Sequence, residues 1–401
     1  MKVDVGDMKI CIVSRGDLSL FFPTQGASVK LYNTVKHLSL LGVRVFFVTA
    51  ENDQYFEVKN RIFKRKKYPY WLAKSPVTKR MKKILSWFGI PPEIFPLYHP
   101  LINFKLWLKV LYVAIKERVN LIQAEFTCFG IPAIFTKLLT SIPVCLVEHN
   151  VETFQIPETT SISKRGRRIV KAIEKFVCNF SDRIIAITKE DKKRLEILGI
   201  CNKKIKIIPH GIDLGFFKKT NGKKVRKKFK LKFPTLIFHG VYSYKANYDA
   251  VKIIAKKILP KLEKEMIKTR VLAVGDFPPK DVKHSNLIFT GVVNNLPDYI
   301  DAADIAIVPI QAGGGMRMKI LEYFASKKPV ISTRKGVEGI PVKNGEEIIL
   351  ADIEEFPKKI VKLIKSRKLR KEIAENAFRF VQDYDWKKIC KKYVEIYRQI
   401  L

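Results

Sequence analysis

The chain has 401 residues, of which 47% are hydrophobic, and a formal net charge of +38. This length suits two ordinary domains, each with its own hydrophobic core. The six cysteines form no C-x-x-C pair, which disfavours a disulfide framework or a structural zinc site and favours a reducing, cytoplasmic compartment. No segment has the pattern of a secretory signal or of a membrane-spanning helix.

The positive charge is concentrated in two runs. Residues 59–83 contain eleven Lys or Arg and no acidic residue, and aromatic residues lie among and after them. Residues 218–232 contain nine basic residues and no acidic one. Cationic and aromatic side chains together predict that residues 59–88 contact an anionic membrane surface. The alternative is a solvated face of a lysine-rich protein, and nucleic acid is disfavoured because no binding motif accompanies the charge.

Short apolar runs alternate with amphipathic stretches along the first half of the chain. A strand at 10–14, a helix at 27–41 and a strand at 43–49 form a βαβ pattern, which requires parallel strands. Residues 1–213 are therefore predicted to form an open α/β domain. The basic, Pro-rich insert at about 59–100 is predicted to form helices or loops on its rim, where an acceptor would bind. Further strands are expected at 121–124, 144–148, 183–188 and 206–208.

The same alternation begins again near residue 215. It predicts a second doubly wound domain over residues 214–385, after a Pro- and Gly-containing hinge at 208–213. The final residues, 386–401, have the pattern of an amphipathic helix that can pack back on the first domain. Strands of the second domain are expected at 235–239, 270–274, 287–290, 305–309, 330–333 and 347–350.

The clearest candidate site follows the expected strand at 305–309. Three consecutive glycines allow the backbone to approach a phosphate, and the next helix presents free N–H groups to it. Arg317 and Lys319 add two cations where a diphosphate would lie, and Glu322 suits ribose hydroxyls. A glycine triplet also fits a loop without a ligand, but these additional residues favour a site. The glycines are Gly313, Gly314 and Gly315.

Two further candidates lie in the first half of the chain. His149 directly follows the buried strand at 144–148 and has polar neighbours on both sides. A lone histidine is usually structural, but one just beyond a strand end is well placed to line a cleft. The turn at 22–28 opens the first helix around Gly26, and its N–H groups are expected to reach the donor phosphate from the opposite domain.

Taken in order, these motifs resemble the retaining glycosyltransferases of family four. The resemblance implies an α/β protein of GT-B fold, with two Rossmann-like, doubly wound parallel-sheet domains facing across a cleft. The second domain would hold most of the nucleotide-sugar donor, and the first would hold the acceptor. The matching segments are the turn around Gly26 and residues 148–150, 181–185, 208–213, 240–249, 291–292, 313–322 and 329–333.

The implied reaction moves a hexose from a nucleotide diphosphate sugar to a glycan or lipid-linked acceptor with retention of anomeric configuration. The family needs no metal ion or cofactor, and the absence of an Asp-x-Asp motif at a strand end agrees with this. Polysaccharide biosynthesis in the cytoplasm, peripheral to the inner membrane face, is the expected setting. An epimerase acting on sugar nucleotides and a non-catalytic glycan- or membrane-binding relative remain as alternatives.

The resemblance also implies roles for single residues. His149 would contact the transferred sugar, Glu322 would hold the ribose, and Val292 would lie near the base. Arg317 and Lys319 would stabilise the leaving diphosphate, an electrostatic contribution that can be the largest in catalysis. The predicted catalytic residues are His149, Arg317 and Lys319, and the predicted donor-binding residues are Gly26, Gly240, Lys245, Val292, Gly313, Gly314, Gly315 and Glu322.

Three positions depart from the family pattern. Gly314 stands in place of the first of two glutamates, which leaves the identity of the sugar open. Val241 replaces an arginine, so Lys245 is an expected substitute and Arg317 would take more of the phosphate binding. His210 replaces an asparagine and is interpreted as a tolerated change in the hinge. Together these positions indicate a subgroup with a Gly-Gly-Gly-x-Arg loop.

Overall fold

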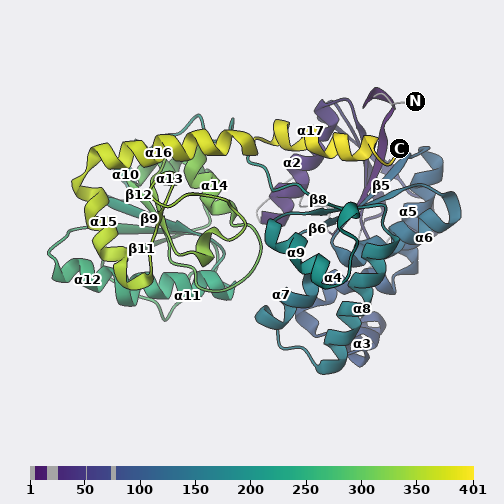
Figure 1. Cartoon of the computed structure of the whole chain (residues 1–401), viewed down its shortest axis with the longest axis horizontal. Coiled ribbons are helices and arrows are strands. Elements are labelled where there is room, and N and C mark those ends of the chain that lie inside the picture. Colours follow the sequence, from purple (N-terminus) through teal and green to yellow (C-terminus); the bar gives the residue numbers. More distant parts are fainter. Residues whose placement is uncertain (1–4, 16–25, 51, 74–77) are drawn as a thin grey trace. The chain divides into compact units, whose positions relative to one another are not determined.

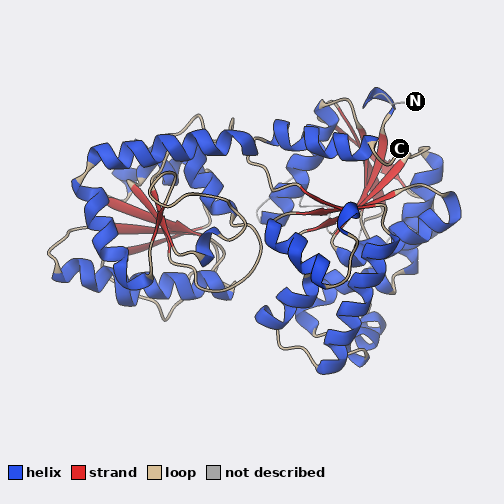
Figure 2. Ribbon diagram, in the orientation of Figure 1, coloured by secondary structure: helices blue, strands red, loops and turns tan. Residues whose placement is uncertain are grey.

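A computed structural model describes residues 5–15, 26–50, 52–73 and 78–401 (Figure 1). The chain divides into two compact units. The first comprises Met1–Gly211 together with Trp386–Leu401, and the second is Ile212–Asp385. In each unit, helices flank a central sheet (Figure 2). The division falls inside the predicted hinge at 208–213.

The first unit contains an eight-stranded sheet in the order β4-β3-β2-β1-β5-β6-β7-β8. All neighbouring strands from β2 to β8 in this order pair in parallel. The strands are β1 (Lys9–Val13), β2 (Arg44–Val48), β3 (Gln54–Lys59), β4 (Ile62–Lys67), β5 (Leu121–Glu125), β6 (Val144–Glu148), β7 (Arg183–Ala186) and β8 (Ile205–Ile207). Every residue of β5 and β6 is buried, as expected for central parallel strands covered on both faces.

Helices cover both faces of this sheet. The helices of this unit are α2 (Gly26–Leu40), α3 (Lys79–Trp87), α4 (Phe95–Tyr98), α5 (Phe104–Lys116), α6 (Gly130–Thr140), α7 (Glu152–Thr159), α8 (Lys164–Phe180), α9 (Lys189–Ile197) and the C-terminal α17 (Trp386–Arg398). Helix α17 packs against α2, so the chain returns to its first unit. No helix in the described ranges combines the length and apolarity needed to cross a bilayer.

The insert at 59–100 differs from its prediction of helices or loops on the rim. Strands β3 and β4 form an antiparallel hairpin at the edge of the sheet, so that edge is not parallel. The charged β4 was not recognised as a strand because lysines and arginines on an edge strand face solvent, where they prevent further pairing. Helices α3 and α4 do lie in the insert, and they bury a small apolar cluster that includes Leu85, Tyr98 and Ile156.

The second unit contains a six-stranded, fully parallel sheet in the order β11-β10-β9-β12-β13-β14. Its strands are β9 (Thr235–His239), β10 (Arg270–Val274), β11 (Leu287–Gly291), β12 (Ile305–Val308), β13 (Val330–Ser332) and β14 (Ile349–Leu350). Its helices are α10 (Gly222–Lys228), α11 (Lys245–Ile253), α12 (Leu259–Lys264), α13 (Leu296–Ala302), α14 (Met318–Ala325), α15 (Phe356–Lys365) and α16 (Arg367–Val381).

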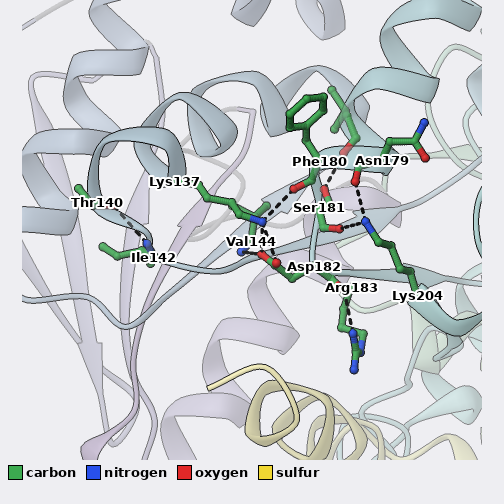
Figure 3. A network of polar contacts seen from close by, with 11 residues as sticks. Lys137, Thr140, Ile142, Val144, Asn179, Phe180, Ser181, Asp182, Arg183 and Lys204 are labelled. Carbon is green, nitrogen blue, oxygen red and sulfur yellow. Dashed lines mark hydrogen bonds and ion pairs between the residues drawn. The ribbon is translucent and has the colours of Figure 1, made fainter.

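A polar network anchors the starts of β6 and β7 to the end of α8 (Figure 3). The Lys137 ammonium lies 2.7 and 2.8 Å from the Asp182 carboxylate, which also accepts a hydrogen bond from the backbone N–H of Val144. The Lys204 ammonium donates to the carbonyls of Asn179 and Ser181. Cations are favourable at a helix C-terminus. The network therefore fixes β6, whose opposite end leads into His149.

Candidate functional site

Two glycine turns touch backbone to backbone at the carboxyl edge of the second sheet. The N–H of Gly240, after β9, donates to the carbonyl of Val274, and the N–H of Gly275, after β10, donates to that of Gly291. A Cβ on Gly275 would lie 1.9 Å from the carbonyl oxygen of Gly240, so no other residue fits there. Gly275 was not predicted as a site residue, although it follows its strand just as Gly240 does.

The glycine loop lies between β12 and α14. Gly313 and Gly315 adopt φ values of 89° and 79°, in the left-handed region that favours glycine. A Cβ on Gly313 would also lie 2.3 Å from the Tyr244 hydroxyl. The loop therefore requires glycine for its backbone shape as well as for space.

Arg317 braces this loop. Its Nη1 donates to the carbonyl of Gly314 at 3.0 Å, and its Nη2 donates to those of Ala312 and Gly313 at 3.0 and 2.7 Å. The side chain is buried. The structure thus places the guanidinium against the loop backbone, beside the start of α14, with both terminal nitrogens engaged by carbonyls.

Lys319 is a buried cation in the first turn of α14. Its Nζ donates to Oδ1 of Asn247 at 2.8 Å and lies 4.1 Å from the ring centroid of Phe238. Burial, and secondarily the charge of Arg317, lower the pKa of Lys319 to about 7, although Glu322 opposes the shift. The partners of this ammonium are an amide and an aromatic face. Such a site favours the arrival of an anion.

Glu322 lies on the same helix, one turn further on. Its Oε2 is 2.6 Å from Nε2 of His239, the last residue of β9, and its side chain is 20% exposed. The carboxylate is thus partly open to solvent and held from one side. His239 was missed as a site residue because it falls inside the expected strand at 235–239.

The other two predicted residues of the second unit are exposed. The Lys245 side chain is 84% exposed, and its Nζ lies 2.8 Å from the carboxylate of Asp249. Val292 follows Gly291 at the end of β11 and is 67% exposed. Neither side chain is held in place by packing, in contrast to Lys319.

In the first unit, His149 belongs to a buried charged cluster. Its Nε2 lies 2.6 Å from Oε2 of Glu125, the last residue of β5. The Lys30 ammonium, on α2, lies 2.8 and 2.6 Å from the two oxygens of the same carboxylate. The ring of Phe126 stacks on the imidazole with a centroid distance of 4.0 Å. Lys30 and Glu125 were missed, although Glu125 follows an expected strand at its ligand-binding edge.

Burial and the charges of this cluster determine the protonation state of His149. Burial would raise the pKa of Glu125, but Lys30 and His149 lower it to about 2. Burial and the nearby Lys30 lower the pKa of His149, against the opposing effect of Glu125. A neutral imidazole beside a carboxylate donates its hydrogen from Nε2, which leaves Nδ1 as an acceptor. His210 lies beside this ring, with a centroid distance of 5.6 Å.

Gly26 is the first residue of α2. Residues 22–25 of the predicted turn lie outside the described residues. The same helix carries Lys30 one turn later, so the helix that begins at Gly26 supplies the cation of the His149 cluster.

Three more carboxyl groups of the first unit, those of Glu148, Glu152 and Glu174, are buried and interact with one another, and no lysine or arginine of the described residues forms an ion pair with them. Glu152 accepts a 2.5 Å hydrogen bond from Tyr98, and Glu174 accepts from the backbone N–H groups of Glu152 and Thr153. Burial, then the charge of Glu174, raise the pKa of Glu152 to about 8, and burial also raises that of Glu148. In the part of the chain that is described, no three His, Cys, Asp or Glu side chains are grouped so as to hold a metal ion.

The fold and these motifs define a class of enzyme. The structure is similar over 98% of this chain to a sucrose-phosphate synthase from Thermosynechococcus elongatus, with 99% of that chain covered, a TM-score of 0.70 and 16% identity. It is equally similar to Anabaena HepE in complex with UDP, with 98% and 100% of the two chains covered, a TM-score of 0.70 and 16% identity. The protein therefore has the GT-B fold of glycosyltransferases, which confirms the predicted fold class.

Sequence comparison gives the family. Residues 24–216 match Glycosyltransferase Family 4, and residues 233–366 match Glycosyl transferases group 1. An uncharacterized glycosyltransferase of Methanocaldococcus jannaschii is 26% identical over 77% of this chain and 83% of its own length. The chain belongs to the GT-B glycosyltransferases, and the predicted resemblance is confirmed at that level.

Proposed function

We propose that this glycosyltransferase moves a hexose from a nucleotide diphosphate sugar to a glycan or lipid-linked acceptor, with retention of configuration and without a metal ion or cofactor. The main support for this proposal is the placement of Lys319. It is a buried ammonium at the N-terminus of α14, and its hydrogen-bond partner is an amide. A donor diphosphate would supply the opposite charge at a helix end that already favours anions.

The remaining donor contacts follow from this placement. Glycines of the 313–315 loop and Gly240 let the backbone approach the diphosphate, while Arg317 keeps the loop in shape. Glu322 binds the ribose, and Val292 lies beside the base. Anabaena HepE, which shares the fold, has been solved with UDP and with UDP-glucose, which supports a nucleotide sugar as donor.

His149 supplies a contact to the transferred sugar. As a neutral ring donating to Glu125, it offers Nδ1 as an acceptor for a sugar hydroxyl. In the proposed reaction the bond from the anomeric carbon to the diphosphate breaks, and the acceptor oxygen bonds to that carbon on the same face. The acceptor proton passes to an oxygen of the departing diphosphate, so no protein base is required. Lys319 stabilises the charge that develops on this leaving group.

A lipid-linked acceptor is supported by the surface of residues 59–88. Tyr70 and Trp71, which follow the basic β4 in the chain, are 98% and 61% exposed, and Trp87, at the end of α3, is 66% exposed. Such side chains suit the interface of an anionic bilayer. Co-sedimentation with anionic vesicles should occur and decrease as salt rises, because the attraction is screened. Equal binding to neutral vesicles, or none to anionic ones, contradicts this role.

The donor is identified by a thermal-shift screen of UDP, GDP and ADP sugars, because a bound ligand raises the unfolding temperature. The product formed with a glycan acceptor is then examined by mass spectrometry and by NMR of its anomeric proton, with and without EDTA. A sugar altered in the absence of acceptor would indicate an epimerase. Transfer that persists in Lys319→Met would show that the glycine-loop site is not the donor site.

A further inference from the structure

His239, at the end of the central strand β9, is held at three points by two consecutive residues of α14. Its Nε2 lies 2.6 Å from Oε2 of Glu322, and its Nδ1 lies 2.8 Å from the hydroxyl of Tyr323. Its backbone nitrogen lies 3.1 Å from the same hydroxyl. Tyr323 is fully buried, and 9% of His239 is exposed.

The position of each hydrogen follows from what these groups can donate. The backbone N–H of His239 only donates, so the Tyr323 oxygen accepts from it. The phenol hydrogen in turn needs an acceptor, because a buried hydroxyl is rarely left unpaired, and Nδ1 of His239 is that acceptor. The ring hydrogen is therefore on Nε2, and it is donated to Glu322.

This series of hydrogen bonds determines how Glu322 meets a ligand. Oε2 is occupied by His239, which leaves Oε1 for a partner outside the protein. A carboxylate on an exposed helix face otherwise rotates broadly about its terminal torsion. Here Tyr323 fixes the tautomer of His239, and His239 fixes the plane of the carboxylate. Recognition of sugar hydroxyls requires that kind of fixed acceptor.

We propose that His239 is a positioning residue for recognition of the ribose, and that His239 and Tyr323 together make the site selective for ribonucleotides. This rests on the proposed role of Glu322 in the donor site. Without a donor at Nε2, the carboxylate loses its orientation and much of its gain from accepting the 2′ and 3′ hydroxyls. The diphosphate contacts of Lys319 are unaffected.

Two matched variants distinguish the hydrogen bond that His239 donates to Glu322 from the packing of its side chain. In His239→Gln the amide nitrogen takes the place of Nε2 and still donates to Glu322. In His239→Asn the amide lies near Nδ1 and reaches only Tyr323. With UDP, GDP or ADP, whichever binds the wild-type chain in calorimetry, we expect affinity to fall about tenfold in H239N and to stay within about threefold in H239Q.

The second arm of the test uses the 2′,3′-dideoxy form of the same nucleotide. We expect H239N and Tyr323→Phe to bind this form as well as the wild type does, because the hydroxyls that Glu322 would bind are missing. Equal losses for both nucleotide forms would mean a merely structural role and would overturn the inference. If H239N unfolds at a lower temperature than the wild type, Y323F takes its place in the comparison of the two nucleotide forms, and H239Q remains the control.

Glu322→Ala distinguishes the two levels of the proposal. If the wild type binds none of the three diphosphates, the proposed donor site is wrong, and the role of His239 is wrong with it. If E322A weakens binding while H239N and Y323F do not, the donor site stands and the positioning role is overturned.

Discussion

Each candidate site contains a buried lysine, Lys30 in the first unit and Lys319 in the second, but the two lysines have different partners. In the first unit the Lys30 ammonium lies 2.8 and 2.6 Å from the two oxygens of Glu125. In the second unit Lys319 has the amide of Asn247 and the face of Phe238, and its pKa is lowered to about 7, chiefly by burial. The first cation is paired with a carboxylate, whereas no carboxylate of the described residues forms an ion pair with the second.

This difference indicates what each unit is built to bind. A cluster whose charges already cancel suits a neutral ligand, such as the hydroxyls of a sugar beside His149. A cation without a carboxylate partner suits an anion, because the ligand itself completes the pair. Under the proposed function, the lysine of the first site therefore has a structural task, and that of the second has a binding task. Four predictions test this contrast.

The largest effect is expected for Lys30→Met. It leaves the Glu125 carboxylate buried without its cation, which should destabilise the first unit by about 3–5 kcal/mol. All four tryptophans of the chain, Trp71, Trp87, Trp107 and Trp386, lie in this unit, so denaturation followed by their fluorescence reports on it alone. The double variant K30M/E125M should recover much of the loss. A single variant as stable as the wild type would refute the contrast.

Lys319→Met should have the opposite profile. Replacing a desolvated ammonium by an apolar side chain should leave stability unchanged or slightly raised, while nucleoside diphosphate affinity falls about 100-fold through loss of a charge-assisted contact. Lys245→Met is the matched control, since that side chain is exposed, and should change affinity less than about threefold. Calorimetry measures both. Similar losses of affinity in the two variants would show that Lys319 has no specific role in binding the diphosphate.

The affinity of the wild type should also depend on pH above neutrality. The lowered pKa of Lys319, about 7, means that its ammonium loses a proton as pH rises, whereas a bound diphosphate favours the protonated form. Affinity should thus decrease by up to about tenfold per pH unit between pH 7.5 and 9. K319M should give a flat profile over this range. A slope retained in K319M would assign the effect to another group.

The fourth prediction concerns buried carboxyl groups for which the described residues supply no cation. The pKa of Glu152 is raised from 4.5 to about 8, first by burial and then by Glu174, so the fold favours its protonated form. The resulting stability is present below pH 4.5 and is lost as pH rises toward 8, by up to about 1.4 kcal/mol per pH unit. Glu152→Gln should reduce this slope in tryptophan-monitored unfolding. An unchanged slope would show that Glu152 is ionised in the fold.

Most of the fold was accessible from the sequence because central parallel strands are buried on both faces. Strands β6, β9 and β10 have the bounds that the sequence predicted for them. The β3–β4 hairpin was missed because β4 is an edge strand whose charges face solvent. Hydrophobic periodicity indicates buried residues, and the residues of β4 are little buried.

The site was accessible only in part. The glycine loop, Lys319 and Glu322 lie in one short segment, so the sequence was enough to predict them as one site. Their partners come from far along the chain: Asn247 lies 72 residues before Lys319, and His239 lies 83 before Glu322. The burial that lowers the pKa of Lys319, and the carbonyl contacts that engage Arg317, depend on the folded backbone. No local pattern carries that information.

Helix α17 belongs to the first unit, but it is synthesised after the whole second unit. Trp386 fills the space beside Gly211, where a Cβ would lie 2.6 Å from the indole, and Tyr397 hydrogen-bonds Gln123, which donates to Glu125. On the ribosome the first unit must therefore wait while residues 212–385 are made, about 10 to 35 seconds at ordinary elongation rates. A nascent chain acquires the full surroundings of its His149 cluster only after α17 has been made.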